Sequence, residues 1–221
     1  AEVEQSGKID KEENSTKVCS SRIKIKAELK LADIVNIGVE WLKDITSPSK
    51  VKTTDKLVDN SGYYAKIGSS GDSAKIGSSG DYAQIGSSGD SAQIGSSGDS
   101  AKIGSSGDYA QIGSSGDYAQ IGSSGDYAKI GSSGDSAQIG SSGDSAQIDS
   151  TGEDSVIMCA GNKSKAKAKI GSWITLAEWE WSDDKNRYVP VCVKTEYVDG
   201  ENIKADTWYQ LKNGKFVEVN E

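Results

Sequence analysis

Aspartate is the residue in this chain whose type and spacing could support chemistry. Carboxylate oxygens are preferred calcium ligands, and calcium-binding β-rolls place one aspartate in each nine-residue repeat. Aspartates recur here every nine residues, at Asp72, Asp81, Asp90, Asp99, Asp108, Asp117, Asp126, Asp135 and Asp144. Their glycines lie one and four residues before each aspartate, whereas the calcium motif has them two, four and five before it. Two interpretations stay open: a calcium site along the aspartates, or aspartates that accept hydrogen bonds from N–H groups of their own or the next coil.

Other residue types that catalysis or metal binding commonly needs are missing or badly spaced. The chain has no histidine, which is the commonest general base and metal ligand. Cys19, Cys159 and Cys192 are far apart and odd in number, which fits neither a metal site nor a disulfide framework and favours a reducing compartment. The repeated Gly-Ser-Ser-Gly is not a phosphate loop, because no Gly-Lys-Ser/Thr follows it. We expect no enzymatic activity, and no cofactor beyond the calcium considered above.

A nine-residue repeat positions these aspartates. From Tyr64 to Ile148 the chain repeats Ala-(Lys/Gln)-Ile-Gly-Ser-Ser-Gly-Asp-(Ser/Tyr) almost without change. The isoleucines of the repeat, which we predict to form the core, are Ile67, Ile76, Ile85, Ile94, Ile103, Ile112, Ile121, Ile130, Ile139 and Ile148. A short fixed period of this kind indicates a stacked repeat architecture.

Each repeat predicts one short strand and one turn. Ala74 and Ile76 are two residues apart, so in a strand both point inward while Ser73 and Lys75 point outward. Gly-Ser-Ser-Gly-Asp is typical of a turn, in which glycine would supply positive φ angles. One nonapeptide is too short to enclose a core, so we predict two nonapeptides, 18 residues, per coil. The predicted fold class is mainly β: a β-solenoid (β-roll) of about five coils, on the order of 24 Å long at about 4.8 Å per coil.

Two repeats per coil also determine which residues share an outer face. One sheet would show Tyr64, Tyr82, Ser100, Tyr118 and Ser136, and the other Ser73, Ser91, Tyr109, Tyr127 and Ser145. Tyr118 and Tyr127 then lie on opposite faces. We therefore expect no continuous aromatic stripe.

Residues 1–62 are predicted to form N-terminal strands, a capping helix and a connector. Residues 1–4 and 20–28 alternate apolar and polar side chains, as strands do, around a charged loop from Lys8 to Thr16. A helix over about residues 29–45 has an apolar stripe at three- and four-residue spacing. The stripe includes Leu31, Ile34, Val35, Trp41, Leu42 and Ile45. We expect this helix to cover the open first coil and block edge pairing; a membrane-binding or partner-binding helix is the alternative.

Residues 63–170 are predicted to be the solenoid with degenerate last coils, and residues 171–221 a C-terminal β-rich cap domain. Strands are predicted at about 173–181, 188–195, 208–212 and 215–219, with Asn213-Gly214 as a hairpin turn. Four of the five tryptophans and the only phenylalanine lie in this part. Such a cluster is more typical of the core of a small sheet than of a ligand surface, so we interpret it as a cap.

Charge and hydropathy argue against nucleic acid and membrane as partners. The formal net charge is −8, which argues against a basic nucleic-acid-binding surface. No apolar run is long enough to cross a membrane, and no signal peptide is recognisable. These features leave the localisation open between the cytoplasm and an assembly on a phage or cell surface.

Two resemblances follow from particular segments. Ser73-Ala74-Lys75-Ile76-Gly77 resembles the strand-and-turn piece of trimeric adhesin head β-rolls, which implies a shared architecture. The flanks resemble an uncharacterised family of gut bacteria and their phages or prophages, in which nonapeptide arrays vary in sequence and length. The segments that carry this second resemblance are Ala1–Gly7, Ser21–Glu28, Asp206–Tyr209 and Asn213–Val219. That family brings no established activity, and its members usually have a further N-terminal domain, which implies that this chain is a processed or trimmed product.

The patterns together predict a structural or interaction protein. No repeat is singled out as a site, and a core of two apolar side chains per repeat is thin. We therefore expect a rigid rod that associates with further copies of the chain into an oligomer or filament, without a membrane partner. The alternative is a binding module, either for calcium along the aspartates or as an acidic decoy for a nucleic-acid-binding protein.

Overall fold

The structure is a computed structural model of the chain, and it describes residues 2–11, 18–27 and 58–220. Contacts divide the chain into two compact units, Ala1–Lys52 and Thr53–Glu221. The described residues form strands and turns, with no α-helix among them. The predicted helix at residues 29–45 and its apolar stripe lie outside the described residues, and the domain limits at residues 62 and 170 stay predictions.

The N-terminal unit contains an antiparallel hairpin of β1 (Glu2–Lys11) and β2 (Val18–Ala27). Glu2 lies opposite Ala27, and Lys11 lies opposite Val18. Strands on either side of a turn were expected here. The predicted loop begins too early, however, because Ile9 and Asp10 still pair with β2 and extend β1 to Lys11.

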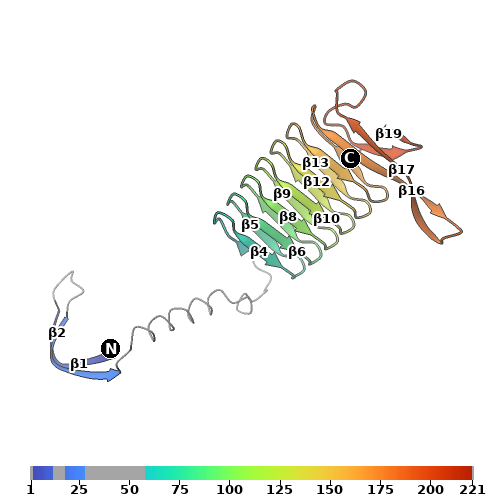
Figure 1. The fold of residues 1–221 in the computed structure, drawn as a ribbon. Coiled ribbons are helices and arrows are strands. Elements are labelled where there is room, and N and C mark those ends of the chain that lie inside the picture. Colours follow the sequence, from blue (N-terminus) through green and yellow to red (C-terminus); the bar gives the residue numbers. More distant parts are fainter. Residues whose placement is uncertain (1, 12–17, 28–57, 221) are drawn as a thin grey trace. The chain divides into compact units, whose positions relative to one another are not determined.

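The second unit is a β-solenoid in which each nonapeptide forms one short strand (Figure 1). Its strands are β3 (Val58–Asp59), β4 (Lys66–Ser69), β5 (Lys75–Ser78), β6 (Gln84–Ser87), β7 (Gln93–Ser96), β8 (Lys102–Ser105), β9 (Gln111–Ser114), β10 (Gln120–Ser123), β11 (Lys129–Ser132), β12 (Gln138–Ser141), β13 (Gln147–Ser150), β14 (Val156–Cys159) and β15 (Lys165–Lys167). Alternate strands belong to alternate sheets. Sheet I has the order β17-β16-β14-β12-β10-β8-β6-β4, and sheet II has the order β19-β18-β15-β13-β11-β9-β7-β5-β3.

Strand pairing confirms two nonapeptides per coil. In sheet I, Ile121 lies opposite Ile103 on one side and Ile139 on the other, each 18 residues away, and all three strands are parallel. The twelve short strands from β4 to β15, taken two per coil, make six coils. The prediction of about five coils is one too few, because the degenerate segment that contains β14 and β15 keeps the same pairing.

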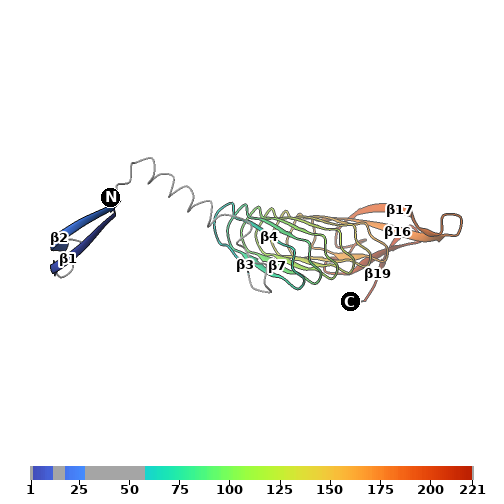
Figure 2. The same cartoon turned by 90° about the horizontal axis from the view of Figure 1, so that it is seen from below.

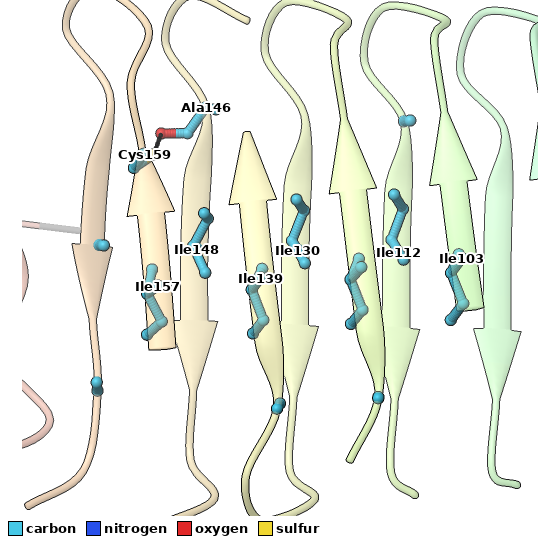
Figure 3. Close-up of a cluster of buried hydrophobic side chains, with 14 of the residues drawn as sticks. Ile103, Ile112, Ile130, Ile139, Ala146, Ile148, Ile157 and Cys159 are labelled. Carbon is cyan, nitrogen blue, oxygen red and sulfur yellow. Dashed lines mark hydrogen bonds between the residues drawn. The ribbon is translucent and has the colours of Figure 1, made fainter. Parts of the chain in front are cut away.

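The core lies between the two sheets, and the alanine and isoleucine of each repeat fill it. All ten predicted core isoleucines and the alanines two residues before them are buried, with at most 7% of any of these residues exposed. Figure 3 shows the labelled isoleucines in two rows, with Ile103, Ile139 and Ile157 on strands of sheet I and Ile112, Ile130 and Ile148 on strands of sheet II. Burial of these side chains at alternate positions confirms the predicted strand face.

The turns differ from the prediction in which residue takes a positive φ. It is the serine or tyrosine after each aspartate, for example Tyr118 at φ 57°, and its N–H donates to the carbonyl of Asp135 one coil later, at 2.9 Å. The turn glycine has another reason. A Cβ on Gly116 would lie 2.1 Å from the carbonyl oxygen of Gly98 in the preceding coil, so glycine is needed because successive turns stack closely.

The C-terminal strands continue the two sheets of the solenoid (Figures 1 and 2). In sheet I, β16 (Trp173–Ser182) runs parallel to β14, and β17 (Arg187–Tyr197) runs antiparallel to β16. In sheet II, β18 (Tyr209–Lys212) runs antiparallel to β15, and β19 (Lys215–Glu218) runs antiparallel to β18. All four predicted strands are present within one or two residues at each end. Asn213 and Gly214, at φ 51° and 65°, form the predicted hairpin turn.

Candidate interaction surfaces

Each outer face of the solenoid consists of two columns of residues. The first residue of each strand, lysine or glutamine, points outward and forms a ridge, while the third residue, glycine, also faces outward and leaves a groove beside it. A Cβ at Gly104, Gly113 or Gly122 would have no atom within 4 Å. The strand periodicity thus gives both sheets a flat face, on which a ridge and a groove run side by side along the solenoid.

The groove on sheet I is the larger one. It has a volume of about 1190 Å³, runs along β4, β6, β8, β10 and β12, and ends at Val156 and Met158 of β14. The charged side chains along it are Lys66 and Lys102, and no acidic residue lines it. The corresponding groove on sheet II has a volume of about 660 Å³ and ends at Asp149 and Trp208.

An apolar patch lies where the sheet I groove ends. Strand pairing places Val156, Trp173 and Tyr197 in one rank across β14, β16 and β17, and the Trp173 and Tyr197 rings are 5.1 Å apart. With Met158 and Val193 these residues form what we call the apolar patch. Their exposed fractions are 53% for Val156, 53% for Met158, 47% for Trp173, 65% for Val193 and 43% for Tyr197.

The sheet II groove ends in charged residues instead. Asp149 occupies the position of the groove glycine, and its carboxylate lies 3.0 Å from Nζ of Lys167 on the next strand. The ammonium groups of Lys165 and Lys167 lie 4.8 and 5.2 Å from the ring centroid of Trp208, which places them within cation–π range. The sheet I groove therefore ends in apolar residues and the sheet II groove in charged ones, although the same nonapeptide repeats form both grooves.

The aspartates form two ladders along the turns. Oδ1 of Asp99 accepts the N–H of Asp117, and Oδ1 of Asp117 accepts the N–H of Asp135, both at 2.9 Å. The first ladder contains Asp72, Asp90, Asp108, Asp126 and Asp144, and the second contains Asp81, Asp99, Asp117 and Asp135. This geometry matches the interpretation in which each aspartate accepts an N–H from the next coil.

At the end of each ladder another residue type replaces aspartate. The ladders end with Glu153 and Asn162, whose N–H groups donate to Asp135 and Asp144 at 2.8 Å. Among the described residues no further rung follows either ladder, so the side chains of residues 153 and 162 have no N–H of a next rung to accept, and aspartate is not needed there. Among the described residues, no group of three or more His, Cys, Asp or Glu side chains is placed to bind a metal ion.

The tyrosines lie in the turns and form short stacks. Tyr64 and Tyr82 have ring centroids 5.2 Å apart, and Tyr109 and Tyr127 are 5.0 Å apart. The two stacks belong to different sets of turns, because Tyr82 precedes a strand of sheet I and Tyr109 one of sheet II. The predicted positions on the outer strand faces are wrong, since these residues have the positive φ angle of the turn.

The interior also contains polar groups that the sequence analysis did not consider. The fourth residue of each strand from β5 to β13 is a buried serine, and Oγ of Ser114 and Ser123 has no hydrogen-bond partner among the described residues. In the last coil Cys159 and Ala168 take this position. Burial raises the pKa of the Cys159 thiol to about 12, so this cysteine is a poor nucleophile.

The grooves and the apolar patch were missed at the sequence level. The sequence analysis assigned both glycines of each repeat to the turn. The first of them is in fact the third residue of the strand, which faces outward like the first residue. The degenerate repeats carried a signal: the groove glycine is replaced by Asp149 and Met158, whereas the turn glycine persists as Gly152 and Gly161. That contrast distinguishes the face position, where a side chain has space, from the turn position, where only glycine fits.

The fold defines the class of protein as a β-solenoid repeat protein with an 18-residue repeat. Comparison with protein-family models, with curated proteins and with solved structures found no match. The resemblance to the gut-bacterial and phage family therefore stays a prediction. In the part of the chain that the structure describes, no helix has the length and apolar character needed to cross a membrane.

Proposed function

We propose that this chain is a structural repeat protein whose solenoid acts as a rigid rod and self-associates into an oligomer or filament. The observation that carries the proposal is uniformity. From β4 to β12 the backbone pairing is the same in every coil, and each strand has lysine or glutamine and then glycine at its outward positions. A small-ligand or catalytic site needs a distinguished position, and these coils have none, so a non-catalytic role fits them best.

Rigidity follows from the way each coil is bonded to the next. Every coil is joined to its neighbours through both sheets, and side-chain bonds such as Asp117 Oδ1 to the N–H of Asp135 tie the turns together. Six coils at about 4.8 Å each give a rod on the order of 29 Å long. Such a rod suits a spacer or a building block, since its faces keep their spacing over the whole length.

Closure of the rod ends is part of the same proposal. The C-terminal cap would be formed by β16 to β19, because β17 and β18 reverse the strand direction and end the parallel ladder. At the other end, β4 and β3 are the outermost strands of their sheets among the described residues. An exposed edge of this kind invites pairing, so we assign the predicted helix at residues 29–45 to cover it. A phage or bacterial-surface assembly, as the flanking resemblance implies, would be the setting.

Sedimentation velocity of the whole chain over a wide concentration range tests self-association, and electron microscopy tests the shape. We expect species larger than the monomer that grow with concentration, and particles in which rods lie side by side or end to end. A strictly dispersed monomer at the highest concentration would contradict the association part of the proposal.

A further inference from the structure

We infer that the outer face of sheet I, from its groove and ridge to the apolar patch, is the surface through which two copies of the chain pair. This inference rests on the proposed self-association and specifies the face and the arrangement. The outer face of sheet II has the same repeats and serves as the internal comparison.

The apolar patch is the first reason. Its five residues are each about half exposed, and they lie on three adjacent strands, β14, β16 and β17. Val156, Met158, Trp173 and Tyr197 occupy neighbouring positions, whereas the paired Thr175 and Thr195 separate Val193 from them. Soluble monomers rarely expose contiguous apolar patches of more than a few hundred Å². Each half-exposed aromatic ring presents roughly 100 Å² and the aliphatic side chains somewhat less, so the patch is on the order of 400 Å². A patch of that size is comparable to the largest apolar patch of an ordinary soluble monomer, and such patches are often functional.

Ridge and groove are complementary to each other. On one strand the two columns are two residues apart, about 6.7 Å, as with Gln120 and Gly122. A two-fold axis parallel to the solenoid and midway between the columns places the ridge of each copy over the groove of the other. Gln120 of one copy then lies above Gly122 of the second, where a Cβ would have no atom within 4 Å.

The same axis also matches the two patches. It carries Met158 of one copy over Val156 of the second, and the reverse. It also places Trp173 and Tyr197 of each copy over Thr175 and Thr195 of the other, so four of the five patch residues are covered at once, and Val193 lies one rank further out. A second copy is the occupant we commit to, because it has the same spacing of about 4.8 Å per coil and can fit the face coil by coil. The interface is isologous and closes as a dimer.

The area agrees with this arrangement. Five strands of four residues give a flat strip of about 24 by 13 Å, or about 300 Å². Together with the apolar patch this reaches roughly 700 Å² on each copy, close to the value of about 800 Å² for standard stable interfaces. The strip by itself would be too small, so the patch decides which face pairs.

Sheet II has the same strip of ridge and groove, but its groove does not end in an apolar patch. Its groove ends at the Asp149–Lys167 ion pair, beside the Trp208 ring that Lys165 and Lys167 approach. Pairing on either face would cover two ridge lysines, but on sheet II it would also cover this ion pair without an apolar gain, which disfavours a buried contact. The two faces therefore predict opposite responses to the same substitution.

The test is sedimentation equilibrium of the full chain and of two matched variants, Gly122→Glu on sheet I and Gly113→Glu on sheet II. Both glycines have open space at the Cβ position, a glutamine two residues earlier, and one glutamine and one lysine on the flanking strands. We expect Gly122→Glu to weaken dimerisation roughly tenfold or more, whereas Gly113→Glu leaves it unchanged. Thermal unfolding by circular dichroism checks that both variants fold like the wild type.

A charge pair tests the orientation of the two copies. Val156→Lys and Met158→Glu each place a charge in the patch and should each weaken association. Lysine is a normal ridge residue, and Asp149 shows that a carboxylate is tolerated at a groove position. An equimolar mixture should recover dimers, because in the parallel arrangement the introduced lysine of one chain meets the introduced glutamate of the other. An antiparallel pair would show no recovery and would overturn this geometry.

The outcomes separate this inference from the function on which it rests. A wild-type chain that stays monomeric, including one whose own N-terminal segment covers the face, overturns both. Wild-type association that survives Gly122→Glu, or that Gly113→Glu weakens equally, overturns only the assignment to sheet I and leaves self-association standing.

Discussion

The faces and the turns of the solenoid come from the same nonapeptide, and they differ in how much room the stacked backbone leaves. At Gly113 on a face, an added Cβ would meet no atom within 4 Å. At Gly116 in the following turn, it would lie 2.1 Å from the carbonyl oxygen of Gly98. Two glycines three residues apart are therefore present for unrelated reasons: one is tolerated on an open surface, and the other is required by contact between coils.

The degenerate coils show what this difference permits. The face position has changed to Asp149 and Met158, while the turn position has stayed glycine at Gly152 and Gly161. The chain can thus alter the chemistry of a face without disturbing the ladder beneath it. An array of this kind separates folding, which depends on the turns and the interior, from recognition, which depends on the faces.

The largest effect should come from exchanging glycine for alanine at the two positions. Gly116→Ala forces a Cβ into the backbone of the preceding coil, so we expect it to lower the free energy of unfolding by more than about 4 kcal/mol or to prevent folding. Gly113→Ala should change it by less than about 1 kcal/mol, with a gain favoured, because glycine is a poor strand residue. Urea unfolding followed by circular dichroism measures both. Equal destabilisation by the two variants would remove the distinction between faces and turns.

A smaller effect is expected from the aspartate ladder. Asp117→Asn keeps an acceptor for the N–H of Asp135, and Asp117→Ala removes it, while both variants lose the same charge. We expect the alanine variant to be less stable than the asparagine variant by about 1 kcal/mol, the usual net worth of one hydrogen bond.

The end of the ladder supplies the control for that comparison. Glu153 donates its N–H to Asp135 but has no following rung to bond. Glu153→Ala and Glu153→Gln should therefore have nearly the same unfolding midpoint in urea. A difference at position 153 as large as that at position 117 would show that the ladder bond is not what the measurement detects.

Much of the fold follows from local spacing, and the remainder depends on contacts between coils. Ala74 and Ile76, two residues apart, predict the inward strand face, and the length of one nonapeptide predicts two per coil; the pairing and burial confirm both. Asn213-Gly214 predicts its hairpin for an equally local reason, since both residues accept positive φ.

The role of the turn glycine could not be predicted in this way. Whether glycine serves a positive φ or a close approach depends on the neighbouring coil, which composition does not specify. The apolar patch was hidden for a similar reason. Val156, Trp173 and Tyr197 become neighbours only through the pairing of β14, β16 and β17, and their separations in sequence follow no repeat.

The interior gives a third, smaller test. It asks whether the buried serine of the core is required for stability, as the turn glycine is. Ser114 is buried, and its hydroxyl has no hydrogen-bond partner among the described residues. A buried hydroxyl without a partner is costly, so Ser114→Ala should raise the free energy of unfolding by about 0.5–1 kcal/mol. The chain already has Ala168 at the equivalent place in its last coil.

Ser115→Ala is the matched control for that change, since Ser115 is exposed and should have little effect. Loss of stability in Ser114→Ala, measured as a lower unfolding midpoint in urea, would indicate that the hydroxyl is bonded inside the core. In that case the interior would be as specific as the turns, and the contrast with the faces would become sharper.

The smallest effect is expected from calcium. A carboxylate column with about 4.8 Å between coils would ordinarily attract a divalent cation, because like charges at that distance repel by about 1 kcal/mol in water. Here Oδ1 of each aspartate already accepts an N–H from the next coil, and the ladder is complete without an ion. We therefore expect the same melting temperature in EDTA and in millimolar calcium, within about 1 °C of each other, since 1 kcal/mol shifts a domain of this size by about 2–4 °C. A rise of several degrees with calcium, abolished by Asp117→Asn together with Asp99→Asn, would instead make the turns a binding site and reverse the assignment of recognition to the faces.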